Sequence, residues 1–295
     1  MVIDASEILI FLVTLFATLL GPICGIGGGV IINPVIESFQ IMPVAASSFL
    51  SSAAVMTMAL VTIFQKTIKH NLSIDSFRVL PLAVGSAVGG VVGKIVFNEL
   101  SQSVFPNPEL TGAVQGALLV ILCFAAIIFV IFKSKIETFH VDSTCLVYLI
   151  GFIAGMLWSF LGIGGGPFNV ALLLFFFSLN SKEAAQASLF IISFSQAANI
   201  IYSVCLGGVP QIDLWILFGM CASAVAGSFI GSWASKRMNL VAVDKVYVAA
   251  LGLVLIVCIF NFVKFHSTSI HIVFSLKIAN FQLMSIVFNY LNKLN

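Results

Sequence analysis

Two glycine-rich stretches contain the residues of this chain that are best suited to bind a ligand. They read GPICGIGGGVIINPV over residues 21–35 and FLGIGGGPFNVALL over residues 160–173. Glycine lacks a side chain, so its N–H groups are open to a ligand and its backbone adopts conformations closed to other residues. A short helix starting after each glycine run, at Val30 and at Pro167, would point its positive end at the break. Two such ends inside a membrane predict an anion site without a fixed cation.

Five polar side chains follow the breaks or lie in the next helix, where they would add hydrogen bonds. The candidate substrate-binding residues are Gly27, Gly28, Gly29, Asn33, Gly164, Gly165, Gly166, Asn169, Ser188, Gln196 and Asn199. Asn33 and Asn169 hold nearly matching places, four and three residues past their glycine triplets. Two structural alternatives stay open. The polar side chains could bond neighbouring helices, and the glycines could allow close packing, although packing needs only every third or fourth residue to be small.

The residue pattern does not favour other chemistry. GIGGG lacks the Lys-Ser/Thr pair of a nucleotide-binding loop. An intramembrane enzyme needs paired acids, a Ser–Lys pair or a histidine-rich metal cluster, and the sequence suggests none. We therefore expect no catalytic residue, no metal and no cofactor. Glu37, just past the first break, is the one carboxylate close to either break and a candidate for proton coupling. The six cysteines form no CxxC pair and are interpreted as buried free thiols.

The composition indicates an integral membrane protein. Of the 295 residues, 60% are hydrophobic and only 8% are charged, and the mean hydropathy is +1.17. Because a soluble domain is about 25% charged, the lipid bilayer is the expected surrounding of this chain. The net charge of +2, with scattered lysines and arginines, does not favour a nucleic-acid partner. Acidic residues precede the first apolar run, so we expect that run to be retained rather than cleaved as a signal peptide.

The apolar runs are long enough for membrane helices, since about 20 residues cross the hydrocarbon core. They fall at residues 8–32, 44–65, 77–98, 110–132, 145–177, 184–206, 212–234 and 243–265. The run 145–177 is too long for one crossing, and its glycines divide it. The tail 270–291 carries a narrow polar stripe, which is compatible with an amphipathic interfacial helix or with a ninth crossing.

The sequence contains an internal duplication. Three blocks align in register: Gly25–Gly29 with Gly162–Gly166 at an offset of 137, residues 44–52 with 183–191 at 139, and residues 74–93 with 212–231 at 138. We predict a first transmembrane repeat over 1–140, a second over 141–266, and a C-terminal helix over 267–295. Within the third block, small residues recur every four positions, at Gly85, Gly89 and Gly93 and again at Ser223, Gly227 and Gly231. This spacing predicts close helix packing rather than a binding site.

The distribution of cations favours inverted repeats. Short loops rich in lysine and arginine stay cytoplasmic. If each broken segment crossed once, the two sides would hold six and five cations; as re-entrant hairpins, one side holds nine and the other only Lys94 and Lys264. We therefore predict an all-α polytopic membrane protein of two homologous, inverted repeats, each with a glycine-broken re-entrant hairpin and three transmembrane helices, plus a further C-terminal helix. No lysine or arginine is expected deep in a crossing.

The two breaks resemble those of a known family. GIGGGVIINPV and GIGGGPFNVALLLF are each followed by an alanine- and serine-rich helix, AASSFL and AAQASLF. This pattern, over residues 8–265, resembles the sulfite exporter TauE/SafE family of membrane transporters. The resemblance implies transport of a sulfur-containing anion, such as sulfite, thiosulfate or an organosulfonate, across a bacterial plasma membrane. Phe49 departs from the family pattern where the second half keeps Ser188, which predicts a site less symmetric than the fold.

Together these features predict a secondary transporter, not an enzyme, that moves a small sulfur-containing anion by alternating access. The sequence has no ATP-binding motif, so a gradient is the expected drive. An anion channel, or a carrier for a non-sulfur anion such as a small carboxylate, is the alternative. A non-transporting scaffold would leave the matched breaks unexplained. The expected partners are the anion and the lipid bilayer; homo-oligomer formation, direction and coupling ion stay open.

Overall fold

The computed structural model describes residues 5–39, 41–68, 76–103, 108–161, 165–207 and 209–259, and each regular element in these ranges is a helix. The helices are α1 (Ala5–Cys24), α2 (Gly29–Ser38), α3 (Val44–Ile68), α4 (Ser76–Ser103), α5 (Pro108–Phe132), α6 (Thr144–Phe160), α7 (Gly166–Phe177), α8 (Ser181–Tyr202) and α9 (Leu214–Arg237). A 3-10 turn, Lys133–Lys135, follows α5, and a π-helical turn, Ser203–Gly207, follows α8. A last described helix, Leu240–Ile259, follows α9. The predicted C-terminal helix over 267–295 lies outside the described residues.

Six helices of the described part are long and apolar enough to span a membrane. These candidate spans are Ala5–Cys24, Ala45–Ile68, Val79–Val96, Ser181–Cys205, Leu214–Arg237 and Leu240–Ile259. Shorter apolar helices occupy Ala117–Phe132, Thr144–Phe160 and Gly166–Phe177. Large apolar side chains are exposed around the outside, such as Phe64, Phe218 and Ile256 at 66%, 69% and 68%. This outward apolar surface is what a lipid bilayer would cover, and it confirms the predicted all-helical membrane protein.

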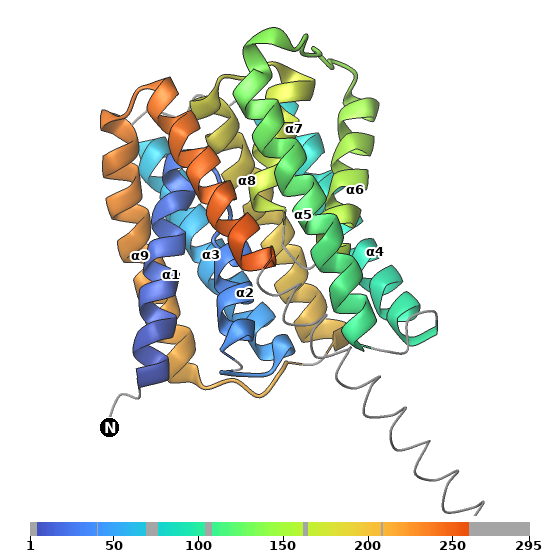
Figure 1. The fold of residues 1–295 in the computed structure, drawn as a ribbon, viewed down its shortest axis with the longest axis vertical. Helices are drawn as coiled ribbons and strands as arrows, with labels where there is room; N and C mark the ends of the chain where they lie inside the picture. Colours follow the sequence, from blue (N-terminus) through green and yellow to red (C-terminus); the bar gives the residue numbers. More distant parts are fainter. Residues whose placement is uncertain are drawn as a thin grey trace, which may run out of the picture.

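Each broken segment enters and leaves the molecule at one end (Figure 1). α1 starts at the lower end of the view and α2 leads back toward it, whereas the α5–α6 loop lies at the upper end. Phe139 N–H in that loop donates to Phe175 O at 2.8 Å, and Val141 N–H donates to Phe176 O at 3.2 Å. α7 therefore ends beside the loop from which α6 starts. We call the two ends the N-terminal face and the opposite face.

Two helix pairs pack in the same way at opposite sides of the molecule. A side chain on Gly89 or Gly93 of α4 would collide with the backbone of Phe152 or Met156 on α6. On α9, a side chain on Gly227 or Gly231 would likewise meet the backbone of α1 around Leu15 and Leu19. The contacting glycines of the two pairs are 138 positions apart in the sequence, and their partners on α6 and α1 are 137 apart. Equivalent residues of the duplication therefore make the same contact twice. The small residues therefore have the packing role that their spacing predicts.

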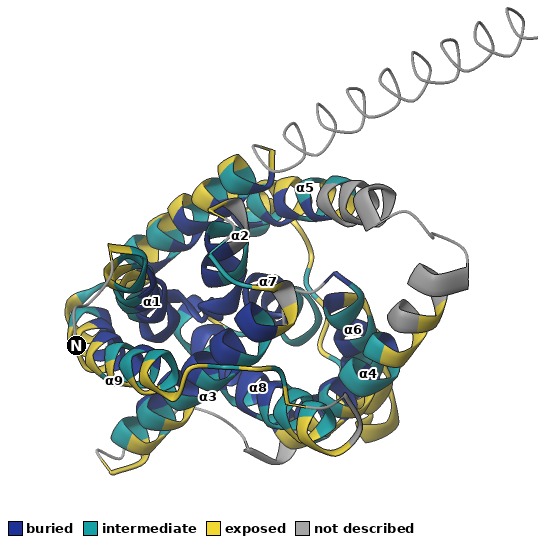
Figure 2. Cartoon of the chain, turned by 90° about the horizontal axis from the view of Figure 1, so that it is seen from below, coloured by how far each residue is buried: buried dark blue, intermediate teal, exposed yellow. Residues whose placement is uncertain are grey.

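The helices that carry the breaks lie in the centre of the fold. Figure 2 shows α2, α3, α7 and α8 between the flanking pair α1 and α9 and the flanking pair α4 and α6. Largely buried residues line the centre, including Leu50, Met58, Leu189 and Ile192, each 1% exposed or less. α8 begins with a capping box, in which Asn180 accepts from Glu183 N–H and Glu183 accepts from Asn180 N–H. This cap fixes where the central helix starts.

Candidate functional site

The two glycine breaks touch at the centre of the protein. A side chain added to Gly166 would collide with the backbone nitrogen and Cα of Gly27. Every residue from Leu20 to Ile32 is buried, as is every residue from Gly165 to Val170. The predicted meeting of the breaks is therefore a backbone-to-backbone contact enclosed by the surrounding helices.

The starts of α2 and α7 provide the positive ends of this contact. Val30 N–H donates to Gly27 O at 3.3 Å and Ile32 N–H to Gly28 O at 2.9 Å, so α2 grows away from the break. α7 begins at Gly166 with a proline in its first turn, and Gly165 takes a left-handed conformation with φ +83°. A helix leaves its first N–H groups without intrahelical acceptors, and these carry a partial positive charge. Two such ends in one enclosed place favour a negative ligand.

Ser188 of α8 joins both breaks through its hydroxyl group. Its Oγ lies 2.7 Å from Gly25 O and 3.3 Å from Gly166 O, and the residue is 0% exposed. Because both partners are carbonyl acceptors, the hydroxyl hydrogen is used to hold the backbone. Ser188 therefore lies at the centre of the candidate site as a clamp between the two halves.

Asn169 has a donor that no described group satisfies. Its Oδ1 accepts from Trp158 Nε1 at 2.9 Å, whereas its Nδ2 is buried without a partner among the described residues. A Cβ on Gly165 would lie 3.2 Å from that nitrogen, so the free donor is at the second break. Asn169 is 3% exposed. A buried donor without an acceptor is costly in a protein, so this nitrogen is a candidate donor to a ligand oxygen.

Trp158 is a residue of the site that the sequence reasoning missed. It fixes the orientation of Asn169 through the indole hydrogen bond and stacks on Phe168, with ring centroids 4.9 Å apart. The available signal was an indole N–H in an apolar run just before the second break, since a buried tryptophan usually finds an acceptor. Tyr247 was missed as well: its hydroxyl donates to Pro167 O and ties α7 to the last described helix.

Asn33 and Asn169 have different surroundings despite their similar places after the breaks. Asn33 is half-buried, and its Oδ1 accepts from Ser47 Oγ at 3.3 Å, near the start of α3. Asn169 instead contacts Trp158 and the second break. One residue of register separates the two positions, and one residue turns a side chain by about 100° around a helix.

Gln196 and Asn199 lie on α8, further toward the N-terminal face. Gln196 is 6% exposed. Asn199 bridges two other helices: its Nδ2 donates to Ser52 Oγ of α3 at 2.7 Å, and its Oδ1 accepts from Lys94 Nζ of α4 at 2.7 Å. Lys94 lies near the end of a crossing, two residues before the last residue of its candidate span. It lies inside the candidate span Val79–Val96, because α4 continues well past it.

The remaining site predictions concern two residues at or near the breaks, the cysteines and possible metal ligands. Gly164 and the side chain of Glu37 lie outside the described residues. The cysteines are free thiols as interpreted, but only Cys24, Cys123 and Cys258 are buried; Cys145 and Cys205 are exposed. Within the described residues, no three histidine, cysteine, aspartate or glutamate side chains gather as a metal site would require.

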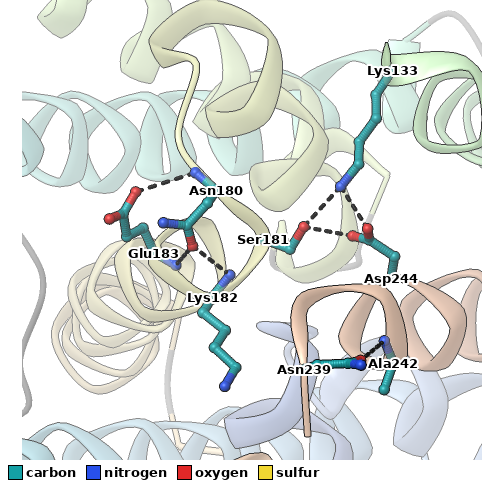
Figure 3. A network of polar contacts seen from close by, with 8 residues as sticks. All are labelled: Lys133, Asn180, Ser181, Lys182, Glu183, Asn239, Ala242 and Asp244. Atoms are coloured by element: carbon teal, nitrogen blue, oxygen red, sulfur yellow. Dashed lines mark hydrogen bonds and ion pairs between the residues drawn. The ribbon is translucent and has the colours of Figure 1, made fainter.

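A polar network lies at the opposite face (Figure 3). Lys133 Nζ, just after α5, donates to Asp244 Oδ2 at 2.7 Å and to Ser181 Oγ at 2.8 Å. Ser181 Oγ in turn donates to Asp244 Oδ1. The network joins the end of α5, the start of α8 and the last described helix. It therefore links the two predicted repeats at the opposite face.

The helices and the site define a class of protein. Broken helices at mid-membrane depth are tolerated only inside the protein, and paired breaks in two halves are typical of membrane transporters. The sequence model described as "Sulfite exporter TauE/SafE" matches residues 10–260, and the chain belongs to this family. It is a multi-pass plasma membrane protein of a transporter family.

The chain is also similar to a curated bacterial protein. Over 269 residues it is 25% identical to the probable membrane transporter protein YunE of Bacillus subtilis (strain 168), covering 85% of this chain and 95% of that protein. No solved structure matches this chain.

Proposed function

We propose that this protein is a secondary transporter for a small sulfur-containing anion: sulfite, thiosulfate or an organosulfonate. The family to which the chain belongs supports this substrate class. The main observation in favour of an anion site is the contact of Gly27 with Gly166, next to the Nδ2 of Asn169, which has no partner among the described residues. An oxyanion beside the two helix starts would accept hydrogen bonds from their first N–H groups and from Asn169.

The proposed mechanism is alternating access between two inverted repeats, residues 1–140 and 141–266. The duplicated packing of α4 on α6 and of α9 on α1 supports this division. Both breaks are buried, as expected of a conformation in which the site is closed to each face. Transport then requires the halves to move relative to one another, with the Lys133–Asp244 network opening when the site faces that side.

The test is flux of labelled sulfite into proteoliposomes that hold the purified protein. Thiosulfate, sulfate and small sulfonates serve as competitors. Gly28→Leu and Gly165→Leu place bulk at the breaks, and Gly165→Leu also forces a side chain into a positive φ, a conformation that costs about 1–2 kcal/mol. Gly252→Leu is the matched control, since nothing lies within 4 Å of a Cβ at Gly252.

We expect saturable flux in the wild type and in Gly252→Leu, with loss in both break variants. Trans-stimulation by anion on the far side would distinguish a carrier from an anion channel, which shows no counterflow. Folded wild-type protein that carries no sulfur anion would contradict the proposed substrate class, and small carboxylates would then be tested in the same vesicles.

A further inference from the structure

Lys94 is a cation within a membrane-spanning helix, and it turns toward the centre of the protein. Its Nζ lies 2.7 Å from Asn199 Oδ1 and 3.4 Å from Ser203 Oγ, and 5.2 Å from the centroid of the Tyr202 ring. A lysine near the end of a membrane helix ordinarily extends toward the headgroups. Here the described contacts are all with neutral groups of α8 and the turn after it.

The described contacts of Lys94 include no carboxylate. The nearest carboxylate on α4 is that of Glu99, which is exposed and five residues after Lys94, and α8 carries none from Ala184 to Tyr202. Charged side chains inside membrane spans are rare and usually mark a substrate or ion pathway. Asn199, the main partner of Lys94, is itself held in place by its second hydrogen bond, to Ser52 Oγ at 2.7 Å.

One face of α8 connects Lys94 to the glycine breaks. Ser188, Ile192, Gln196 and Asn199 follow one another at the three- and four-residue spacing that keeps side chains on one side of a helix. Ser188 contacts both breaks, and Asn199 contacts Lys94. At 1.5 Å per residue, Asn199 lies about 17 Å along the helix from Ser188. This is roughly half of a 30 Å hydrocarbon core, so Lys94 lies near the N-terminal face if the breaks lie at mid-membrane.

In this conformation an apolar side chain interrupts that face. Ile192 is 0% exposed, and its Cδ1 would lie 3.3 Å from a Cβ at Gly27. It separates Ser188 at the breaks from Gln196 nearer to Lys94. An anion held at Lys94 would therefore wait outside the closed part of the protein until Ile192 moves.

We propose that Lys94, oriented by Asn199, is an entry site for the anion on the N-terminal face, from which the anion follows α8 to the breaks. The ligand is a small oxyanion, and the inference rests on the proposed transport function. The role of Lys94 is attraction of the anion rather than coupling, because Asn199, which binds it, lies about 17 Å along α8 from Ser188.

Sided transport of sulfite in oriented membrane vesicles tests this role. In Lys94→Gln, the KM for sulfite added at the N-terminal face should rise roughly tenfold, the effect of losing one hydrogen bond to a charged group at the entry site. The KM for sulfite added at the opposite face and the maximal rate should stay within error. Lys94→Arg should keep the wild-type KM, and high salt should reduce the difference between wild type and Lys94→Gln.

Lys135→Gln is the matched control, since Lys135 is an exposed cation next to the opposite face. It should leave the KM at the N-terminal face unchanged. If Lys94→Gln does not fold, Lys94→Met keeps the apolar stem and makes the same comparison. In Lys94→Cys, a thiol reagent that adds an ammonium group should restore the low KM, and a neutral reagent of similar size should not.

Equal KM values in wild type and Lys94→Gln would overturn the inference while the proposed function stands. A rise in KM that is the same from both faces would also overturn it, because it indicates a purely structural lysine. The same holds for a rise in KM that the added ammonium group fails to reverse. Wild-type protein without flux of any sulfur anion would instead remove the proposed function on which the inference rests.

Discussion

The backbone of Gly27 lies against the backbone of Gly166, so the starts of α2 and α7 touch with no side chain between them. Two partial positive charges are thereby held together in a buried place. Such an arrangement is stable when something negative or electron-rich lies between or beside the two ends. Two further donors lie at the same contact: the hydroxyl of Ser188, which is bound to carbonyl groups, and the free Nδ2 of Asn169.

The smallest possible side chain at this contact should disrupt it. Gly166→Ala would place a Cβ against Gly27, where backbone rather than a flexible side chain must move. Overpacking of this kind costs about 1–3 kcal/mol. We expect a lower thermal midpoint of the purified protein in detergent and loss of most sulfite flux. Gly252→Ala, in open space, should match the wild type; normal flux in Gly166→Ala would contradict the site.

Replacing the side-chain amide of Asn169 by a carboxylate should turn attraction of an anion into repulsion. Asn169→Asp keeps an oxygen that accepts from Trp158 but replaces the free Nδ2 donor by a second oxygen, which is negative when ionised. Because a hydrogen bond to a charged group contributes about 1.5–3 kcal/mol, the KM for sulfite should rise by roughly ten- to a hundredfold. The KM is measured by initial-rate flux in proteoliposomes.

The control for this exchange is Asn239→Asp. Asn239 is exposed and caps the last described helix by accepting from Ala242 N–H at 2.8 Å, a role that aspartate fills equally well. An unchanged KM in Asn169→Asp would show that the unpartnered nitrogen does not contact the anion.

Removing the hydroxyl of Ser188 should loosen both breaks together. Ser188→Ala leaves the buried carbonyls of Gly25 and Gly166 without this donor, at a cost of about 1–3 kcal/mol. We expect a lower thermal midpoint and slower flux. Ser193→Ala is the matched control on α8, because Ser193 Oγ bonds only the carbonyl of Phe190 in its own helix. Equal midpoints for the two variants would contradict the clamp.

The Lys133–Asp244 pair should act as one unit. Its side chains are 31% and 23% exposed, so solvent screens it in part and a coupling of about 0.5–1 kcal/mol is expected. We expect the thermal midpoint to fall in Lys133→Met and in Asp244→Asn, and to fall no further when the two are combined. Strictly additive shifts in this double-mutant cycle would show that the pair does not couple.

Labelling of single cysteines from the two sides of the membrane tests the topology. Glu137→Cys and Asn239→Cys should react with an impermeant reagent added at one face, and Phe39→Cys only from the other. The three positions are exposed, and the native cysteines are replaced beforehand. Labelling of Glu137→Cys and Asn239→Cys from different faces would rule out the pair of re-entrant hairpins.

The features that depend on local composition can be predicted from the amino-acid order alone. Low charge and long apolar runs require a membrane, and glycine triplets with Pro167 require helix breaks and starts. The duplication was visible because equivalent positions, such as Gly89 and Gly227, need the same small residue to let helices approach. These requirements act on one residue or one helix at a time, so they can be predicted from the sequence.

Which side chains share a surrounding depends on how the helices pack in three dimensions. Asn33 and Asn169 look alike in sequence, but only Asn169 meets Trp158 and the second break. Ser188 was a candidate ligand, and the structure shows its hydroxyl bound to both breaks. Lys94 lies near the end of α4, yet it contacts Asn199 of the other half. Each of these outcomes depends on residues far apart in the chain, whose meeting no local pattern encodes.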